Sequence, residues 1–158
     1  MQIVREFACT PEEFFEVAAA RFERECATHG APVEDGALAV GSGYEGDGDS
    51  VRITALEPGR SLGWETRSLA GSVASHLGLE PCEAGCRVAF DQDYEDAAAG
   101  KLKQALIFGQ MSNMLIGIFD EVERRREGDG AAVRPETPAQ ASPDSLSLKL
   151  FKRLFAKS

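Results

Sequence analysis

Apolar and polar residues alternate with a period of two along four segments between residues 51 and 94, which is typical of half-buried β-strands. The residues on the apolar faces are Val51, Ile53 and Ala55; Leu62, Trp64 and Thr66; Val73, Ser75, Leu77 and Leu79; and Val88, Phe90, Gln92 and Tyr94. Short glycine-containing turns separate the segments, and connections this short require antiparallel neighbours. The pattern predicts an antiparallel meander within about Ala37–Glu95.

The chain opens with a predicted strand, Met1–Cys9, that leads directly into a helix. Thr10 is a suitable N-cap, Pro11 suits the first helical position and Glu13 completes a capping box. Apolar residues at helical spacing follow: Phe15, Ala18, Phe22 and Cys26. Gly30 then provides the stop.

A second helix is predicted from about Ala97 to Arg126. Its apolar stripe consists of Ile107, Phe108, Met111, Met114, Leu115, Ile118, Phe119 and Val122. This stripe is wider than packing against one sheet requires. Together the elements predict an α+β fold with a curved, six-stranded antiparallel sheet and a long C-terminal helix.

After this helix the composition changes. Residues 127–143 are rich in Ala, Pro, Gly, Glu and Ser, which is typical of a disordered linker. Residues 144–158 follow as a predicted basic amphipathic helix. Its predicted contact residues are Lys149, Leu150, Phe151, Lys152, Arg153, Leu154 and Phe155. Three alternatives stay open for this tail: it binds a membrane surface or protein partner, it folds back on the acidic body, or it has no role.

Charge and hydropathy narrow the classes of partner. The formal net charge of −9 repels phosphate backbones, so a nucleic-acid partner is not expected. The N-terminus lacks the basic-then-apolar layout of a secretory signal. The longest nearly apolar stretch, residues 105–119, is too short and too polar to span a bilayer. We therefore expect a cytoplasmic protein, with peripheral membrane association as the alternative that the tail raises.

Catalytic or metal-binding chemistry is not indicated. Cys82 and Cys86 flank a turn and could lie near each other, but zinc would need two further ligands. The two histidines are poorly placed, because His76 should point outward and His29 ends a helix. No cofactor is expected. Polar side chains that could reach the rim of a pocket are Arg5, Gln92 and Asn113.

The order of elements resembles the START-like, or SRPBCC, helix-grip superfamily, and within it a bacterial branch of stand-alone domains. The resemblance covers residues 1 to about 126. It rests on the opening strand followed by Thr10-Pro11-Glu12-Glu13-Phe14-Phe15 and on the turn Leu56-Glu57-Pro58-Gly59-Arg60-Ser61-Leu62-Gly63-Trp64. The strands Val73–Pro81 and Val88–Glu95 and the closing helix complete it.

The resemblance implies a sheet wrapped around the closing helix, with an apolar cavity between them. The side chains expected to line this cavity are Phe7, Trp64, Phe90, Tyr94, Met111, Met114 and Ile118. Alternatively, the same side chains fill the space themselves. The leading hypothesis is non-catalytic binding of a small hydrophobic or lipid-like molecule. The second is an adaptor that docks a membrane or protein partner through the tail. A third, a cyclase-like or hydrolase-like enzyme, would require a group of polar residues inside the pocket that the sequence does not indicate.

Overall fold

The computed structural model describes residues 1–33, 37–69, 71–94 and 101–128. The strands are β1 (Gln2–Phe7), β2 (Gly43–Gly46), β3 (Asp49–Glu57), β4 (Ser61–Ser68), β5 (Gly71–Cys82) and β6 (Gly85–Tyr94). The helices are α1 (Pro11–Thr28) and α2 (Lys101–Gly128). The chain forms two compact units, Met1–Ala98 and Ala99–Ser158.

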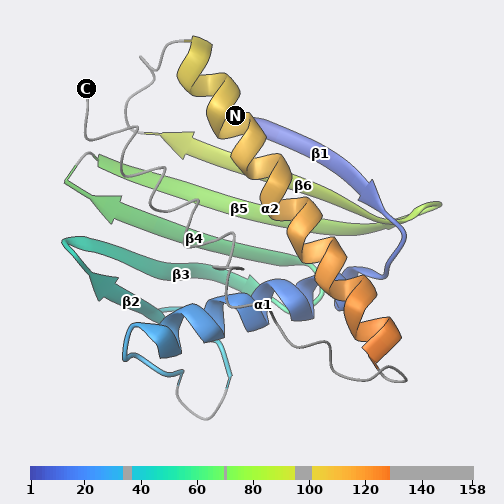
Figure 1. Ribbon diagram of the computed structural model, residues 1–158, viewed down its shortest axis with the longest axis horizontal. Helices are drawn as coiled ribbons and strands as arrows, with labels where there is room; N and C mark the ends of the chain where they lie inside the picture. Colours follow the sequence, from blue (N-terminus) through green and yellow to red (C-terminus); the bar gives the residue numbers. More distant parts are fainter. Residues whose placement is uncertain (34–36, 70, 95–100, 129–158) are drawn as a thin grey trace. The chain divides into compact units, whose positions relative to one another are not determined.

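The first unit contains one curved six-stranded sheet in the order β1-β6-β5-β4-β3-β2 (Figure 1). Every neighbouring pair is antiparallel. Strands β2 to β6 follow one another as a meander, and β1 pairs with β6 at the far edge. The predicted α+β class with a six-stranded antiparallel sheet is therefore confirmed.

Helix α1 begins with the predicted capping box. Thr10 has the extended conformation of an N-cap, with φ −80° and ψ 155°. The Glu13 backbone N–H donates to Thr10 Oγ1, and the Thr10 backbone N–H donates to Glu13 Oε1, both at 3.1 Å. At the other end His29 is the C-cap, and Gly30 has a positive φ of 74° that suits a helix stop. These contacts confirm both predicted ends.

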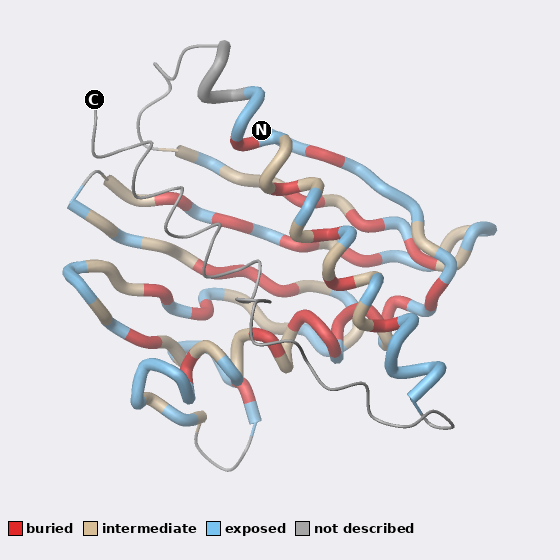
Figure 2. The backbone as a smooth tube through the Cα atoms, in the orientation of Figure 1, coloured by how far each residue is buried: buried red, intermediate tan, exposed pale blue. Residues whose placement is uncertain are grey.

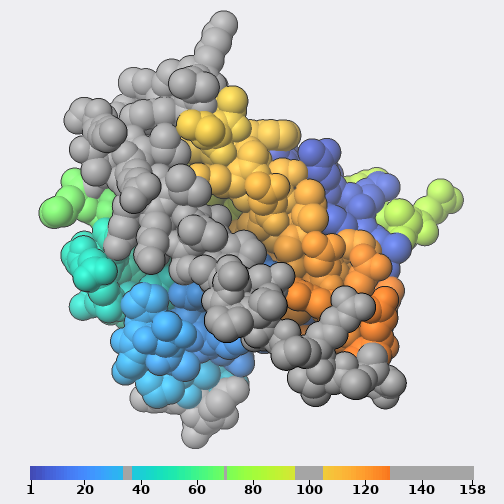
Figure 3. All heavy atoms as spheres, in the orientation of Figure 1, coloured from blue at the N-terminus to red at the C-terminus, as the bar shows by residue number. Residues whose placement is uncertain are grey.

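One face of the sheet is buried, and helix α1 lies on it. Buried and exposed residues alternate along β5 and β6, as Figure 2 shows in red and pale blue. Rings join the helix to three strands: Phe14 to Phe7 of β1, Phe22 to Trp64 of β4, and His29 to Tyr44 of β2. The centroid separations are 5.4, 4.9 and 4.2 Å. We call this buried side the inner face. In the space-filling view α1 (blue) lies beside β2 (teal) (Figure 3).

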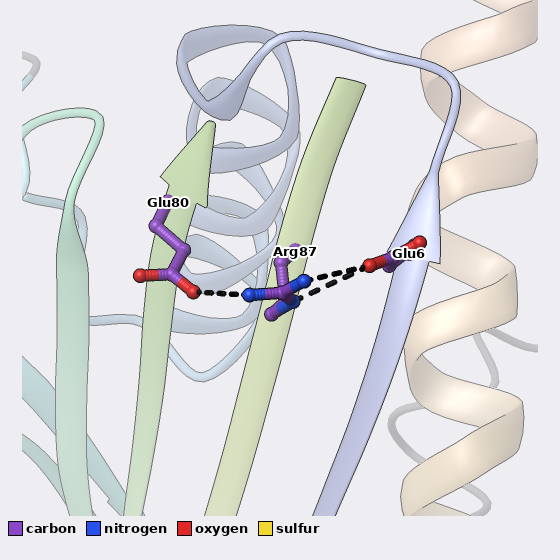
Figure 4. A network of polar contacts seen from close by, with 3 residues as sticks. All are labelled: Glu6, Glu80 and Arg87. Atoms are coloured by element: carbon purple, nitrogen blue, oxygen red, sulfur yellow. Dashed lines mark hydrogen bonds and ion pairs between the residues drawn. The ribbon is translucent and has the colours of Figure 1, made fainter. Parts of the chain in front are cut away.

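The opposite, outer face carries charged side chains. Arg87 of β6 lies between Glu6 of β1 and Glu80 of β5 (Figure 4). Its Nη2 donates to Glu6 Oε1 at 3.0 Å and its Nη1 donates to Glu80 Oε1 at 3.1 Å. All three side chains are exposed, so solvent screens the ion pairs and their contribution to stability is small. The network joins three adjacent strands on the wet side of the sheet.

Helix α2 has a narrower buried stripe than the pattern predicts. Its buried residues are Ile107, Met111, Leu115, Ile118 and Val122. Phe108 is 42% exposed, whereas Met114 and Phe119 are half-buried. At about 100° per residue, Phe108 lies roughly 60° from the centre of the stripe. It is therefore a marginal position rather than a central one.

Several predictions fall on residues outside those described. The predicted helix start at Ala97 is one of them, and helix α2 is described from Lys101. At its other end α2 extends to Gly128, two residues beyond the predicted Arg126. Most of the predicted linker and the whole tail, 144–158, also lie outside, so the domain limits stay a prediction. Within the described ranges, no helix combines the length and hydropathy needed to cross a membrane.

Candidate ligand-binding face

Four of the predicted site residues lie on the inner face of the sheet. The register pairs Phe7 with Cys86 and places Trp64 opposite Ser75. Phe90 and Tyr94 are an even number of residues from Cys86 on the same strand, so their side chains point to the same side. The alternation of the sequence therefore assigned these four aromatic residues to one face correctly. Whether they bind a ligand stays a prediction.

Trp64 lies at the centre of an aromatic cluster. It stacks on Phe90 with ring centroids 5.6 Å apart, and Phe22 of α1 meets it edge-on at 4.9 Å. Trp64 is 7% exposed and Phe90 is 1% exposed. In this part of the inner face, rings from α1, β4 and β6 therefore pack against one another and are largely shielded from solvent.

Toward the end of β6 the inner face becomes more accessible. Cys86, Val88 and Phe90 are buried, whereas Gln92 and Tyr94 further along the strand are half-buried. Thr66, two residues beyond Trp64 on β4, is half-buried as well. The apolar face therefore opens at the end where β6 reaches Tyr94.

A chain of polar side chains lies at this open end. The Tyr94 hydroxyl donates to Gln92 Oε1, and Gln92 Nε2 donates to Ser75 Oγ at 3.2 Å. Ser75 is buried, with 5% of its surface exposed. Burial raises the pKa of Tyr94, so its hydroxyl keeps its proton in ordinary buffers. The result is a short, neutral hydrogen-bonded chain within an apolar surface.

The sequence indicated these polar residues only in part. Gln92 was expected at the rim of a pocket, and it does lie on the inner face beside Ser75. The role of Ser75 was missed, because a serine within an alternating strand gives no sign of its cross-strand partner. The turn could have identified this partner. If Glu83-Ala84 is assigned as a two-residue hairpin loop, the resulting register pairs Ser75 with Gln92.

The other predicted polar residues lie in more exposed positions. Arg5 is exposed on the inner face of β1, and Asn113 is exposed on α2. His76 is exposed and points outward, as expected. On α2, Met111 and Ile118 are each 2% exposed. The contribution of these two residues and Met114 to ligand binding stays a prediction.

The four cysteines are free thiols. Cys86 is fully buried, and burial, followed by the proximity of Cys9 and Cys82, raises its pKa to about 12. A thiol with so high a pKa stays protonated and is a poor nucleophile or metal ligand at neutral pH. Within the described part of the chain, no group of three His, Cys, Asp or Glu side chains is arranged to hold a metal ion.

Several solved structures share this arrangement of strands and helices. The Aha1 dimer from Colwellia psychrerythraea is similar with a TM-score of 0.57 and 16% identity, over 78% of this chain and 95% of that one. The Zhui aromatase/cyclase from Streptomyces sp. R1128 has a TM-score of 0.54 and 17% identity, over 84% and 98%. CalU16 from Micromonospora echinospora has a TM-score of 0.54 and 13% identity, over 98% and 87%.

These likenesses define the fold. The neighbours have the helix-grip fold, in which a curved antiparallel sheet is combined with two helices, the later one long. This chain has the same α+β helix-grip fold. At identities below 20% the likeness establishes the fold and leaves the activity open. No protein-family model matches the chain, and no curated protein matches it.

Proposed function

We propose that this protein is a member of the START-like helix-grip superfamily that binds a small hydrophobic molecule on the inner face of its sheet, without catalysis. One observation carries the proposal: a closed aromatic cluster around Trp64 is continuous with a more accessible end that bears Gln92 and Tyr94. Apolar surroundings with a few convergent polar groups are the usual character of a small-molecule site.

The helix-grip fold is compatible with this proposal. One solved structure of the same fold is an aromatase/cyclase by name. The accessible end of the inner face supplies aromatic surface from Tyr94, which is apolar over its ring and polar at its hydroxyl. A ligand with an apolar body fits these properties.

The experiment has two parts. The protein is purified gently from its host and extracted, and the extract is examined by mass spectrometry for a co-purified apolar molecule. Separately, the full chain is titrated with the fluorescent apolar probe Nile red. The variant Thr66→Phe fills the accessible end, and the control Ala74→Phe adds the same ring to the exposed outer face of β5.

We expect saturable Nile red binding that Thr66→Phe weakens at least tenfold and Ala74→Phe leaves within twofold of the parent. Thermal melts of both variants establish that each is folded. The absence of saturable binding together with an extract free of apolar molecules would contradict the proposal. Equal effects of the two substitutions would also contradict it, because the bound probe would then lie elsewhere.

The tail supports a second candidate function, docking to an anionic membrane and hence a peripheral cytoplasmic location. Lys149, Lys152, Arg153 and Lys157 carry its positive charges among leucine and phenylalanine residues, in a chain of net charge −9. Removing residues 144–158 should abolish binding to vesicles that contain phosphatidylserine and leave the melting temperature nearly unchanged. A large drop in melting temperature would instead indicate that the tail folds back on the body, and unchanged vesicle binding would eliminate this function.

A further inference from the structure

Ser75 is an unusual residue for its position on the inner face. Its neighbours on the same side of β5 are Val73 and Leu77, and all three are at most 5% exposed. Burying a hydroxyl in such surroundings costs free energy unless its hydrogen bonds are made. Alanine would fill the same position at no such cost. The serine therefore raises the question of which bonds its hydroxyl makes.

The hydrogen bonds of Ser75 and Gln92 are only partly used. Ser75 Oγ accepts one bond from Gln92 Nε2, and Gln92 Oε1 accepts one from the Tyr94 hydroxyl. A hydroxyl carries one hydrogen and a primary amide carries two. Within the described residues, the Ser75 hydroxyl hydrogen and the second amide hydrogen of Gln92 have no acceptor. Two donors on adjacent strands thus remain available on one face.

Tyr94 holds the amide of Gln92 in this orientation. Because the Tyr94 hydroxyl donates to Oε1, the amide nitrogen is directed to the other side, toward Ser75. The amide would otherwise be free to turn its oxygen toward Ser75 and offer an acceptor in place of a donor. Tyr94 is thus a positioning residue for the pair of donors.

We propose that the ligand bound on the inner face is a hydrophobic molecule bearing a hydrogen-bond-accepting oxygen, such as a ketone or ester carbonyl, which accepts from Ser75 and Gln92. This inference rests on the proposed function and adds the polar chemistry of the ligand to it. Ser75 and Gln92 face each other across β5 and β6, so a single oxygen can accept from both. A hydrocarbon of the same shape would leave both donors without partners, which costs binding free energy.

The test uses two probes of equal size and displacement of Nile red from the full chain. The ketone 2-acetylnaphthalene has the acceptor oxygen, and 2-isopropylnaphthalene replaces it with a methyl group. We expect the ketone to bind about tenfold more tightly than the hydrocarbon, a ratio that corresponds to about 1.4 kcal/mol. Ser75→Ala should reduce this ratio to about threefold or less, because one donor is lost while the apolar shape is kept.

Gln92→Glu is the second variant, since a carboxylate accepts hydrogen bonds and does not donate them. It should abolish the preference for the ketone while binding of the hydrocarbon changes little. Tyr94→Phe should lower the ratio as well, through loss of the amide orientation. Ser72→Ala, on the opposite side of β5, is the matched control and should leave the ratio unchanged. A thermal melt of each variant confirms that it is folded.

The outcomes separate this inference from the proposed function. If Nile red binds and both naphthalenes displace it equally from the parent protein, the inference is wrong and the hydrophobic site stands. If the ratio is tenfold and survives both Ser75→Ala and Gln92→Glu, the oxygen is recognised elsewhere and the inference is also wrong. If Nile red does not bind and the extract contains no apolar molecule, the proposed function itself fails, and this inference fails with it.

Discussion

The indole ring of Trp64 stacks on the phenyl ring of Phe90, although the two residues lie on strands separated by β5. Strands β4 and β6 are about 9.5 Å apart at the usual strand spacing, whereas the ring centroids are only 5.6 Å apart. The rings must therefore lean toward each other over β5. The small side chain of Ser75, which lies opposite Trp64 on β5, leaves room for this.

Truncating this stack should be costly. Trp64→Ala removes a buried indole that contacts both Phe22 and Phe90, and we expect the free energy of unfolding to fall by about 3–5 kcal/mol. Trp64→Phe keeps a ring in place and should cost clearly less. Trp64 is the only tryptophan, so urea denaturation is followed by far-UV circular dichroism rather than by fluorescence. A cost below about 1 kcal/mol for the alanine variant would show that the ring is not part of the core.

The capping box should also be measurable. Thr10→Ala removes the oxygen that accepts from the Glu13 backbone N–H, and a lost N-cap costs about 1 kcal/mol. Thr28 is the matched control in the same helix, because its hydroxyl bonds back to the Arg24 carbonyl in the last turn. Thr28→Ala should be neutral or slightly stabilising, since this back-bonding does not support the helix. Equal losses in the two variants would contradict an N-cap role for Thr10.

Much of the sheet could be predicted because its inner face is apolar. Buried residues such as Val51, Ile53 and Val88 alternate with more exposed neighbours, and a period of two is typical of a β-strand. Strand β2 (Gly43–Gly46) was not predicted individually. It has four residues, two of them glycine, and pairs only with β3, so pairing rather than propensity determines it.

The candidate site was less accessible to sequence reasoning. The alternation of apolar and polar residues along β4 and β6 predicts that Trp64, Phe90 and Tyr94 share the apolar face. The same alternation does not determine which residue of one strand lies opposite which residue of the next. The contact between Ser75 and Gln92 depends on the register of the β5–β6 hairpin. A shift of one residue would have moved every side chain of a strand to the other face. Polar contacts between neighbouring strands are therefore the part of the candidate site that could not be predicted without the structure.

Gly85 is expected to be irreplaceable by alanine. Its φ is 134°, and an added Cβ would lie 2.7 Å from the carbonyl oxygens of both Phe7 and Cys9. Because these atoms belong to the backbone, the clash cannot be relieved by a side-chain rotation. We expect Gly85→Ala to lower the free energy of unfolding by about 1–3 kcal/mol or more.

Gly78→Ala is the control for this substitution. The nearest atoms to its added Cβ are at 3.8 Å, an ordinary contact, so thermal unfolding of this variant should resemble that of the parent. If Gly85→Ala melted at the parent temperature as well, the hairpin would have to pack differently against the end of β1.

The stability of the protein should fall at alkaline pH through Cys86. Burial is the main cause that raises the pKa of this thiol to about 12, and the neighbouring Cys9, Cys82 and Glu12 act in the same direction. In the unfolded chain the thiol ionises near its ordinary pKa of 9.0. Between these two pH values the thiol is ionised in the unfolded chain and still protonated in the folded protein. The contribution of Cys86 is therefore complete below about pH 9 and is lost as the pH rises toward 12.

Urea denaturation of the parent and Cys86→Ala under reducing conditions measures this contribution. We expect the parent to lose more stability between pH 8 and pH 11 than Cys86→Ala, because the variant has no thiol to ionise at that position. Cys82→Ala is the comparison variant, since Cys82 is half-buried at the turn and contributes less than burial to the raised pKa of Cys86. The stability of this variant should fall with pH nearly as steeply as that of the parent. Parallel slopes for the parent and Cys86→Ala would mean that Cys86 ionises at the same pH in the folded and unfolded protein, and that burial does not hold its proton.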